Sequence, residues 1–348
     1  MNHLFSQFIQ SAFFENKCIG LRKRFGFLSQ AYNRAFDINL LQQGTRTESQ
    51  AMAIEESHAA LRQLKLPTSD SDVSPSSQMP KVIWLYWNTP IETAPEVVQL
   101  SIRSWRELNP GYDVNVLTDS NLSEVLGFDF NATFRLSTIR LSMAAKADIL
   151  RLYLLSRFGG VWADSTTFCL DPLDNWLPDA MACHAFFSFR HNTNPTRPIE
   201  AWFLGAPKQS PVTRHTLKLF LDYVFKPRER SLFTSNKRKM MEKIGVTRNC
   251  RNTLYADTVY KAEQVGFMPY FTVGYFFNEA LRKFYSPDMV QAFYDLPNAH
   301  AIHETEHQAF LSSVVSKQTY KGTYQSEPLF LARRKHLMSL LDRAKTSG

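Results

Sequence analysis

The chain has 348 residues, of which 44% are hydrophobic and 13% aromatic, and it carries a formal net charge of +8. This composition suffices for one large buried core with smaller appendages, and no run approaches the roughly 18 apolar residues of a transmembrane helix. The N-terminus lacks the compact apolar block of a signal peptide and the cysteines show no C-x-x-C spacing, so we expect a cytoplasmic protein in a reducing compartment.

Residues 1–66 are predicted to form a helical N-terminal extension. Apolar residues recur there at helical spacing and basic residues follow them: Phe5, Ile9, Phe13 and Phe14, then Lys17, Arg22, Lys23 and Arg24. Such a stripe fits an anionic membrane surface, packing on a neighbouring domain, or an oligomer contact. A second helix is predicted from Gln50 to Leu66, and residues 67–80 read as a polar, proline-bounded linker.

The next residues predict the opening of a catalytic domain over 81–310. An apolar, β-rich run from Lys81 to Trp87 predicts a central strand, residues 95–108 predict a helix, and Asp113 to Thr118 predicts a second strand. A strand, helix and strand within so few residues form a βαβ unit, which implies a parallel sheet.

Polar and aromatic residues follow these strands at their carboxyl ends, where open α/β sheets bind ligands. Trp87 is placed either to stack on a flat ring or to fill the core. Asn88 is placed to hydrogen-bond a ligand, and Asp119 to bind one or to cap the next helix.

The segment from Ser142 to Thr166 combines a helix, a stop and a strand. Apolar residues at three- and four-residue spacing predict an amphipathic helix from Ser142 to Phe158, which Gly159 and Gly160 end. Val161 to Ala163 then predicts a buried strand that delivers Asp164 to its carboxyl end. Asp148 and Arg151 on the helix have the spacing of a surface ion pair, which is the alternative to a binding role.

The string from Lys146 to Thr166 resembles the signature region of sugar-nucleotide glycosyltransferases with a DXD motif, in particular the bacterial capsular polysaccharide synthesis proteins, relatives of the yeast-type initiating mannosyltransferases. The resemblance implies a GT-A-like (Rossmann-like) α/β fold, with a mostly parallel sheet flanked by helices and helical extensions at both ends. It also implies a nucleotide-sugar donor, and a glycan or lipid-linked glycan acceptor of the capsular or lipopolysaccharide type. Transfer would retain the anomeric configuration through front-face attack assisted by the leaving diphosphate.

The resemblance also assigns roles to individual residues. The implied catalytic residues are Asp148, Asp164 and Glu200, and the implied donor-binding residues are Trp87, Asn88, Asp119, Asp148, Arg151, Ser165 and Thr166. A divalent cation, Mg²⁺ or Mn²⁺, would be held by Asp164, Thr166 and His303 together with the donor's phosphates. Thr166 stands where a DXD motif has its second acid, so the alternative is a non-catalytic transferase-fold protein that binds glycan or membrane.

A basic segment holds nearly the whole excess of positive charge. Nine basic residues there face only Glu229 and Glu242: Lys226, Arg228, Arg230, Lys237, Arg238, Lys239, Lys243, Arg248 and Arg251. An anionic membrane surface on the inner face of the plasma membrane, a phosphate-bearing lipid-linked acceptor and a solvated loop all fit this segment. Nucleic acid does not fit it, because Phe233 is its single aromatic residue and it matches no nucleic-acid module.

Histidines cluster near the end of the predicted domain. His303 to His307 spells H-E-x-x-H, a metalloprotease pattern, but Pro297 and Asn298 just before it predict a turn rather than a long helix. The resemblance instead implies that His303 or His300 binds the donor's diphosphate or completes the metal shell. Residues 311–348 are predicted to be a helical extension, with a helix from Leu329 to Ala344 whose polar side carries Arg333, Arg334, Lys335 and Arg343.

Overall fold

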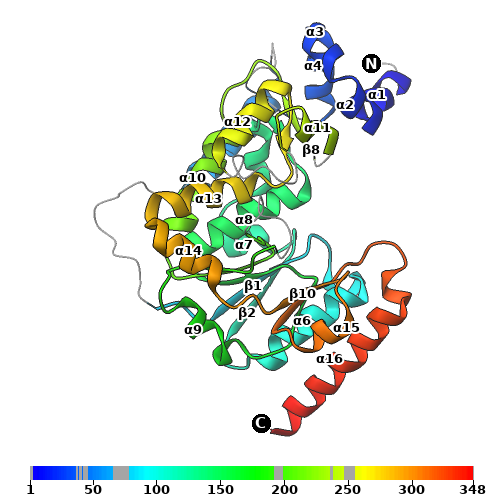
Figure 1. Cartoon of the computed structure of the whole chain (residues 1–348). Helices are drawn as coiled ribbons and strands as arrows, with labels where there is room; N and C mark the ends of the chain where they lie inside the picture. The colour runs from blue at the N-terminus through cyan, green and yellow to red at the C-terminus, as the bar shows by residue number, and fades with distance from the viewer. Residues whose placement is uncertain are drawn as a thin grey trace. The chain divides into compact units, whose positions relative to one another are not determined.

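The computed structural model describes residues 3–36, 38, 41, 46–65, 78–191, 199–235, 238–246 and 255–347, and Figure 1 traces the chain. It divides into two compact units. Unit 1 comprises Met1–Thr68, Ser123–Ile149 and His215–Glu279, and unit 2 comprises Ser69–Leu122, Leu150–Arg214 and Ala280–Gly348. The sequence-based boundaries at 66, 80 and 310 stay predictions, and most of the expected linker lies outside the described residues.

Unit 2 is built on a mixed five-stranded sheet with the order β2-β1-β4-β7-β6. Its strands are β1 (Val82–Tyr86), β2 (Asp113–Leu117), β4 (Gly160–Ala163), β6 (Phe187–Ser188) and β7 (Phe203–Ala206). Strands β2, β1 and β4 run parallel to one another, whereas β7 runs antiparallel to both β4 and β6. The predicted α/β architecture with a parallel sheet is therefore confirmed.

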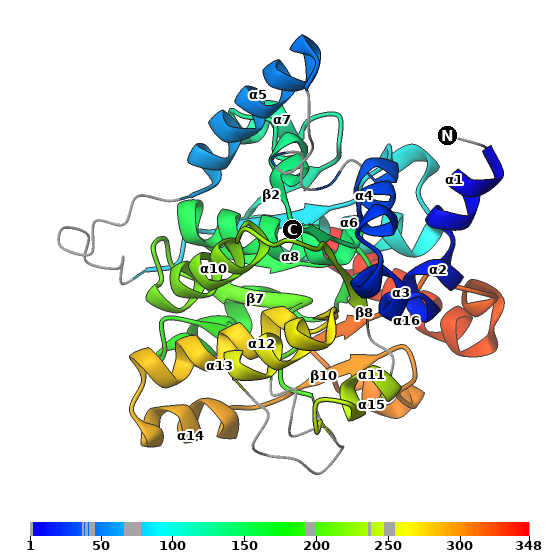
Figure 2. The same cartoon turned by 90° about the horizontal axis from the view of Figure 1, so that it is seen from above.

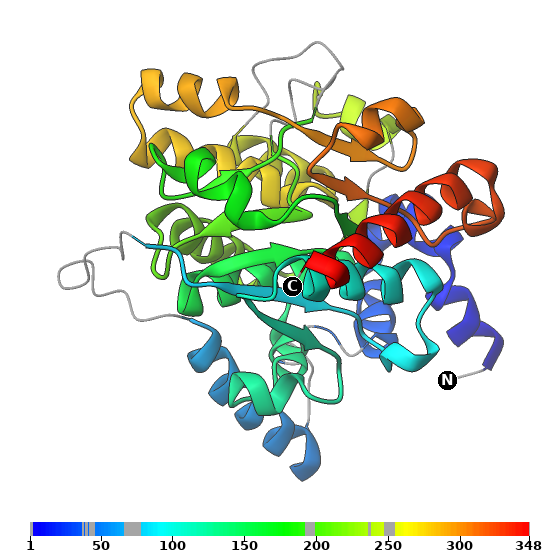
Figure 3. The same ribbon diagram turned by 90° about the horizontal axis from the view of Figure 1, so that it is seen from below.

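The predicted βαβ opening is also confirmed. The connecting helix is α6 (Glu96–Leu108), which Pro95 precedes as its N-cap. One face of α6, with Val97, Val98 and Trp105 fully buried, contributes to the core of unit 2. The C-terminal helix α16 (Pro328–Ser347) packs along α6, as Figures 1 and 3 show.

A second sheet of unit 2 brings distant segments together. Its order is β10-β11-β5, formed by β10 (His300–Ile302), β11 (Val315–Lys317) and β5 (Thr167–Cys169). Strand β11 runs antiparallel to β5 and parallel to β10. The expectation that residues from 311 onward are helical is thus wrong for 315–317, because these residues complete a sheet with strands far away in the sequence.

Two glycines make the turn between helix α8 (Met143–Phe158) and β4 possible. Gly159 and Gly160 have φ values of +73° and +98°. A Cβ on Gly160 would lie 2.4 Å from the carbonyl oxygen of Val82, and one on Gly159 would lie 2.5 Å from the backbone nitrogen of Lys208. Glycine is therefore required at both positions for conformation and for space.

Helix α8 itself differs from the expected amphipathic helix. Ile149, Leu150, Leu152, Tyr153, Leu154 and Leu155 are all buried. A helix surrounded by protein on most sides needs no polar face, so the apolar spacing correctly predicted a helix but not its environment.

Unit 1 is mostly helical. Its N-terminal helices are α1 (His3–Gln10), α2 (Ala12–Lys17), α3 (Ile19–Arg24), α4 (Gly26–Ala35) and α5 (Glu48–Leu64). Helix α5 begins at a capping box formed by Thr47 and Gln50, close to the predicted start, and packs against the 3-10 helix η3 (Asn131–Leu136), as Figure 2 shows.

The remaining elements complete the two units. Unit 1 also holds β3 (Ile139–Arg140), β8 (Leu232–Ser235) and β9 (Met268–Pro269), which form one sheet, with α11 (Arg238–Glu242) and α12 (Ala256–Val265). Unit 2 also holds η2 (Ile91–Thr93), η4 (Leu173–Asn175), α9 (Leu177–Met181), α14 (Pro287–Asp295), α15 (His307–Leu311) and η5 (Tyr324–Ser326). Residues of both units belong to α7 (Leu122–Leu126), α8, α10 (Pro211–Val224) and α13 (Thr272–Phe284).

The N-terminal apolar stripe is partly buried. Ile9 and Phe14 are buried within unit 1, whereas Phe13 is 61% exposed. Phe8 and Phe27, outside the predicted stripe, are also exposed. Within the part of the chain that the structure describes, none of the helices combines the length and hydropathy that a bilayer-spanning segment requires.

Candidate functional site

The carboxylate of Asp164 is the centre of a charged cluster in unit 2. Asp164 directly follows β4, and its backbone nitrogen donates to the carbonyl of Trp202 at 2.8 Å. Its Oδ2 lies 2.6 Å from Nζ of Lys317, and its Oδ1 lies 3.3 Å from Nη2 of Arg151. The indole Nε1 of Trp162 donates to the same Oδ1 at 2.9 Å. The carboxylate is therefore fixed in orientation by two cations and one neutral donor.

Arg151 reaches this cluster from α8. Its side chain is 6% exposed, its guanidinium lies 5.1 Å from the ring centroid of Trp162, and Nη1 donates to the carbonyl of Ala201. Asp148 and Arg151 are both buried, so neither lies on an exposed helix surface. Arg151 instead pairs with the strand-end acid Asp164, a contact that the sequence did not predict.

Lys317 is the functional candidate that sequence reasoning missed. It is the last residue of β11, which pairs with β5, and β5 follows the Asp164 turn after two residues. Its partner Asp164 is 153 positions away in the sequence. The β-branched residues Val314 and Val315, just before Ser316 and Lys317, were the available signal for a short strand that ends in a cation.

The charges in the cluster affect one another's pKa. Burial alone would raise the pKa of the Asp164 carboxyl, but the nearby Lys317 and Arg151 outweigh burial and hold that pKa below its ordinary value. Burial lowers the pKa of Lys317, with Arg151 acting in the same direction, while Asp164 and Glu200 oppose the shift. Asp164 is therefore ionised at neutral pH, and Lys317 loses its proton more readily than an exposed lysine.

The turn that carries the acid is tied to the end of β1. The hydroxyl of Ser165 donates to the carbonyl of Tyr86 at 2.7 Å, and the backbone nitrogen of Gln318 donates to the carbonyl of Thr166 at 2.7 Å. Ser165 and Thr166 are only 3% and 6% exposed. Their predicted donor-binding roles stay predictions, and in this structure the two residues fix the turn.

The donor set around Asp164 does not fit a divalent cation. Both carboxylate oxygens already face cations or an N–H donor, and Thr166 is buried. Across the described ranges, no group of three or more histidine, cysteine, aspartate or glutamate side chains is placed to hold a metal ion. Cations bound by proteins are usually surrounded by several oxygen ligands, whereas here the charges next to the carboxylate are positive.

The carboxyl end of β1 presents an aromatic pair. The rings of Trp87 and Tyr320 meet edge to face with centroids 5.1 Å apart, and Trp87 also packs on the core of unit 2. Its indole Nε1 is buried without a hydrogen-bond partner among the described residues. Asn88 is exposed next to it. Both sequence interpretations of Trp87, a core residue and a ring-stacking residue, remain compatible with this half-buried position.

Asp119 does not act as the helix cap that was its alternative role. The hydroxyl of Tyr86, on β1, donates to its Oδ1 at 2.6 Å. The side chain of Asn121 instead accepts from the backbone nitrogen of Thr118 at 2.8 Å and so closes the turn. Asp119 is exposed at the carboxyl end of β2, beside the end of β1.

The other predicted catalytic residues lie in different surroundings. Glu200 is 8% exposed and close enough to Lys317 to raise the lysine's pKa, so it belongs to the charged cluster. Asp148 is equally buried but lies in the portion of α8 that belongs to unit 1. Its predicted contact with the donor sugar therefore rests on the sequence pattern.

The histidines do not form a metalloprotease site. His303 lies in a turn after β10, and His307 begins the separate helix α15, so the two do not share one helix as H-E-x-x-H requires. Nε2 of His303 lies 3.7 Å from Oε1 of Glu304. His300 is buried against the rings of Phe189 and Trp202, and burial lowers its pKa to about 4, so it is neutral at physiological pH.

Arg333 is not on the polar side of the C-terminal helix as predicted. It is fully buried, and its Nη1 donates to the carbonyl of Ile302 at 3.1 Å and contacts the hydroxyl of Tyr324 at 3.2 Å. Nη2 donates to the carbonyl of Thr305. Arg333 therefore stabilises the turn after β10. The periodicity of the helix could not predict this role, because the carbonyl groups that accept its hydrogen bonds are distant in the sequence.

The chain is similar to one protein family and to known proteins. The family model described as capsular polysaccharide synthesis protein matches residues 37–234. The Saccharomyces cerevisiae protein HOC1, whose name assigns it to the glycosyltransferases, is 30% identical over 108 residues, or 30% of this chain and 27% of that protein. The initiation-specific alpha-1,6-mannosyltransferase of Schizosaccharomyces pombe is 29% identical over 129 residues, or 36% of this chain and 32% of that protein. The matched region thus spans about a third or less of either relative.

Among solved structures, the PaToxG glycosyltransferase aligns with a TM-score of 0.33 and 15% identity, covering 84% of this chain and 96% of that chain. This similarity is too low to assign a fold or a function by itself. The family match, in contrast, covers more than half of the chain and includes Asp164, Arg151 and the strands that position them. The chain belongs to the capsular polysaccharide synthesis protein family.

Proposed function

We propose that the protein is a glycosyltransferase that moves a sugar from a nucleotide-diphosphate donor to a hydroxyl group of a surface glycan. The observation that carries this proposal is the cluster of Asp164, Lys317 and Arg151 at the carboxyl end of β4, beside the carboxyl end of β1. Family membership and the names of the two yeast relatives support the same reaction class. Open α/β sheets bind their ligands at this edge.

The residues of the cluster suggest how the donor would be held. Lys317 and Arg151 supply positive charge where a leaving diphosphate would gain negative charge, and arginine offers a planar fork of donors to phosphate oxygens. Asp164 keeps both cations in place and is itself oriented by Trp162. Catalysis would then come mainly from positioning and from charge stabilisation in a partly buried site.

The aromatic pair of Trp87 and Tyr320 is a suitable wall for the nucleotide base. Aromatic faces hold flat rings without demanding one hydrogen-bond pattern, and Asn88 and Asp119 offer polar groups nearby at the same sheet edge. The unpartnered Nε1 of Trp87 would gain an acceptor if the pair opened around a base.

We further propose transfer with retention by front-face attack. Asp164 is a poor nucleophile for a double displacement, since Oδ2 contacts Lys317 and Oδ1 contacts Arg151 and Trp162. The leaving diphosphate itself would take the proton of the attacking hydroxyl. Nuclear magnetic resonance of the product would identify the anomer, and an inverted product would contradict this mechanism.

We also propose an acceptor and a location in the cell for this reaction. A lipid-linked glycan on the cytoplasmic face of the plasma membrane fits the exposed aromatic residues Phe8, Phe13 and Phe27 of unit 1. Fractionation of cells that produce the protein would show it in the membrane pellet and released by salt or mild detergent. Recovery entirely in the soluble fraction would contradict a membrane-bound place of action.

The test of the proposed reaction is donor turnover across UDP-, GDP- and CMP-linked sugars, with and without Mg²⁺ or Mn²⁺. We expect one nucleotide class to be hydrolysed or transferred, and Lys317→Met to lower kcat/KM by about 100-fold, the cost typical of losing one charge-stabilising donor. Lys81→Met is the matched control, because Lys81 pairs with Asp174 on the surface of the same unit.

The outcomes separate the enzyme from a binding protein. A donor that binds without any turnover would favour the non-catalytic alternative, and a Lys317→Met variant as active as Lys81→Met would remove Lys317 from the site. Binding of divalent cations is measured separately. Since the donor set does not fit a metal, we expect no measurable Mn²⁺ binding in the absence of donor.

A further inference from the structure

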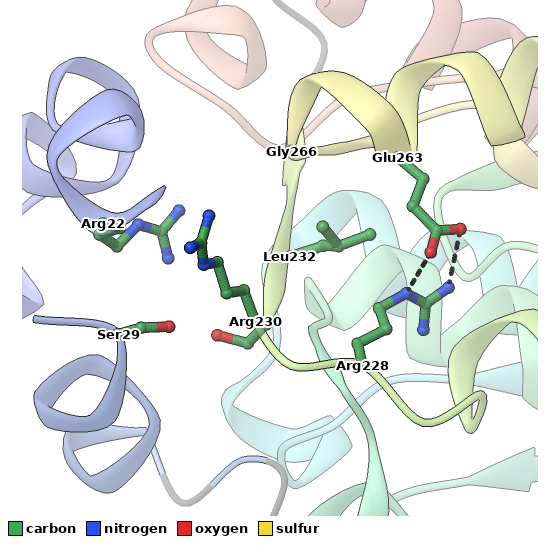
Figure 4. A pocket seen from close by; sticks show the side chains of 8 residues that line it. Arg22, Ser29, Arg228, Arg230, Leu232, Glu263 and Gly266 are labelled. Carbon is green, nitrogen blue, oxygen red and sulfur yellow. Dashed lines mark hydrogen bonds and ion pairs between the residues drawn. The ribbon is translucent and has the colours of Figure 1, made fainter. Parts of the chain in front are cut away.

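Unit 1 contains a cavity of about 160 Å³ that the proposed reaction does not use (Figure 4). Three arginines and two serines contribute to its lining: Arg22, Arg228, Arg230, Ser29 and Ser231. The acidic residue in the lining is Glu263. The volume is several times the roughly 30 Å³ that one water molecule occupies in the liquid, so a small oxyanion fits.

Arg22 is buried here in an unusual environment. It is 5% exposed, and its guanidinium carbon lies 4.3 Å from the ring centroid of Tyr32 and 5.4 Å from that of Phe233. Its Nε and Nη1 have no hydrogen-bond partner among the described residues. Contact with aromatic faces compensates part of the buried charge, but two donors of the fork stay unsatisfied.

The carboxylates that act on this region are already engaged. Glu263 receives two hydrogen bonds from Arg228, at 2.9 and 3.2 Å, and one from Lys226 at 3.0 Å. Glu15, which also attracts Arg22, accepts from the hydroxyl of Tyr32 at 2.5 Å and from Arg140. Neither acid therefore compensates Arg22 as a direct partner.

A second cation faces Arg22 across the cavity. Figure 4 shows the side chains of Arg22 and Arg230 pointing toward each other from opposite walls, while the dashed contacts join Arg228 and Glu263. Arg230 is exposed to solvent. Two like charges that converge on one cavity repel each other unless an anion lies between them.

We propose that this pocket binds a phosphate group, held between the guanidinium groups of Arg22 and Arg230. Arginine presents paired donors that match phosphate oxygens, and such charge-assisted hydrogen bonds are the stronger kind. Bound phosphate would neutralise the guanidinium groups and remove the repulsion between the two cations. The site is independent of the Asp164 cluster, so it stands or fails separately from the proposed reaction.

The phosphate can come from a soluble compound or from a lipid headgroup. Exposed apolar residues adjoin Arg22 in the sequence, with Leu21 at 47%, Phe25 at 41% and Phe27 at 62% exposed. Side chains of this kind insert into the interfacial layer of a membrane, which makes a lipid phosphate a source to test beside a soluble one.

Isothermal titration calorimetry of the full chain with inorganic phosphate tests the site. We expect saturable binding that Arg230→Gln weakens by roughly tenfold, the effect of losing one charge-assisted contact. Arg22→Met should weaken it similarly. The matched control is Arg34→Gln, which changes an exposed arginine of α4 outside the pocket lining and should bind as wild type does.

Co-sedimentation with vesicles then distinguishes the sources. Phosphatidylcholine vesicles that contain phosphatidic acid should retain the wild type more than Arg230→Gln if the phosphate belongs to a lipid. Equal retention of both, together with phosphate binding in solution, would assign the pocket to a soluble phosphate. A wild type that binds neither probe, or an Arg230→Gln variant that binds both as the wild type does, would overturn the proposal.

Discussion

Two groups of buried cations in this protein differ in what neutralises them. In unit 2, Arg151 and Lys317 share the carboxylate of Asp164 through contacts of 3.3 and 2.6 Å. In unit 1, Arg22 rests on aromatic rings and keeps two donors without a partner among the described residues. In the first arrangement a carboxylate of the protein neutralises the cations. In the second, the proposed phosphate would supply the negative charge.

The difference teaches how each region should respond to change. Removing either partner of a buried ion pair strongly destabilises the protein, because the remaining charge stays desolvated and uncompensated. A buried cation without a partner tolerates removal, because its loss also removes the desolvation cost. The following predictions use that contrast, from the largest expected effect to the smallest.

The strongest test of the paired region is Asp164→Asn. The amide keeps the size of the side chain and an acceptor for Trp162, but it removes the charge that holds Lys317 and Arg151 in place. We expect kcat/KM for the donor to fall by about 100- to 1000-fold, as when a preorganised polar group is lost from an active site. Asp174→Asn, on the surface of the same unit, is the control and should stay near wild type. Activity of Asp164→Asn equal to that control would contradict the site.

Stability separates the two regions directly. Arg151→Met should lower the free energy of unfolding by about 3 kcal/mol, because Asp164 loses one of its two cations. Arg22→Met should change it by no more than about 1 kcal/mol, since the methionine keeps apolar contact with the rings while an unpaired charge disappears. Urea unfolding followed by circular dichroism measures both. Equal losses for the two variants would show that Arg22 is compensated after all.

His300 is a third kind of buried group, because it carries no charge at neutral pH. Its pKa is lowered to about 4 by burial, from 6.5 in an exposed histidine, so the unfolded chain binds the proton first as the pH falls. Stability should therefore be unaffected above pH about 6.5 and decline by about 3 kcal/mol between there and about pH 4. His300→Gln should remove this part of the pH dependence. Parallel pH profiles for wild type and variant would contradict the neutral, buried assignment.

The smallest effect concerns the alkaline side of the rate profile. Because burial lowers the pKa of Lys317, its positive charge is lost at a lower pH than that of an exposed lysine. Lys317→Arg keeps the charge, since arginine stays protonated, and should move the alkaline decline of kcat/KM to higher pH even if the maximal rate is lower. Rate profiles of both proteins that decline together would assign the alkaline limb to another group.

Much of the fold was predictable because its signals are local. The run from Lys81 to Trp87, the helix before Asn109 and the alternation after it defined a βαβ unit that the structure contains. Gly159 and Gly160 marked a turn that the structure forms with positive φ at both residues. Such features depend on neighbours within a few positions, which a single sequence displays.

Part of the candidate site was predictable for the same reason. Asp164 could be placed at a strand end, and Arg151 on the preceding helix, since both belong to one continuous segment. Lys317 could not be paired with them, because its strand reaches Asp164 only through pairing with β5. Arg333 was likewise misplaced, since a helix face accepts a buried cation when distant carbonyls receive its hydrogen bonds.

The sequence by itself determined the βαβ opening, the glycine turn and the position of an acid at the end of β4. Tertiary structure alone decided what each buried charged group contacts. Lys317 contacts Asp164 across 153 positions in the sequence, and Arg22 contacts the rings of Tyr32 and Phe233. The physical reason is that periodicity and turn chemistry act over one or two turns of chain, whereas burial and charge pairing depend on packing between distant segments.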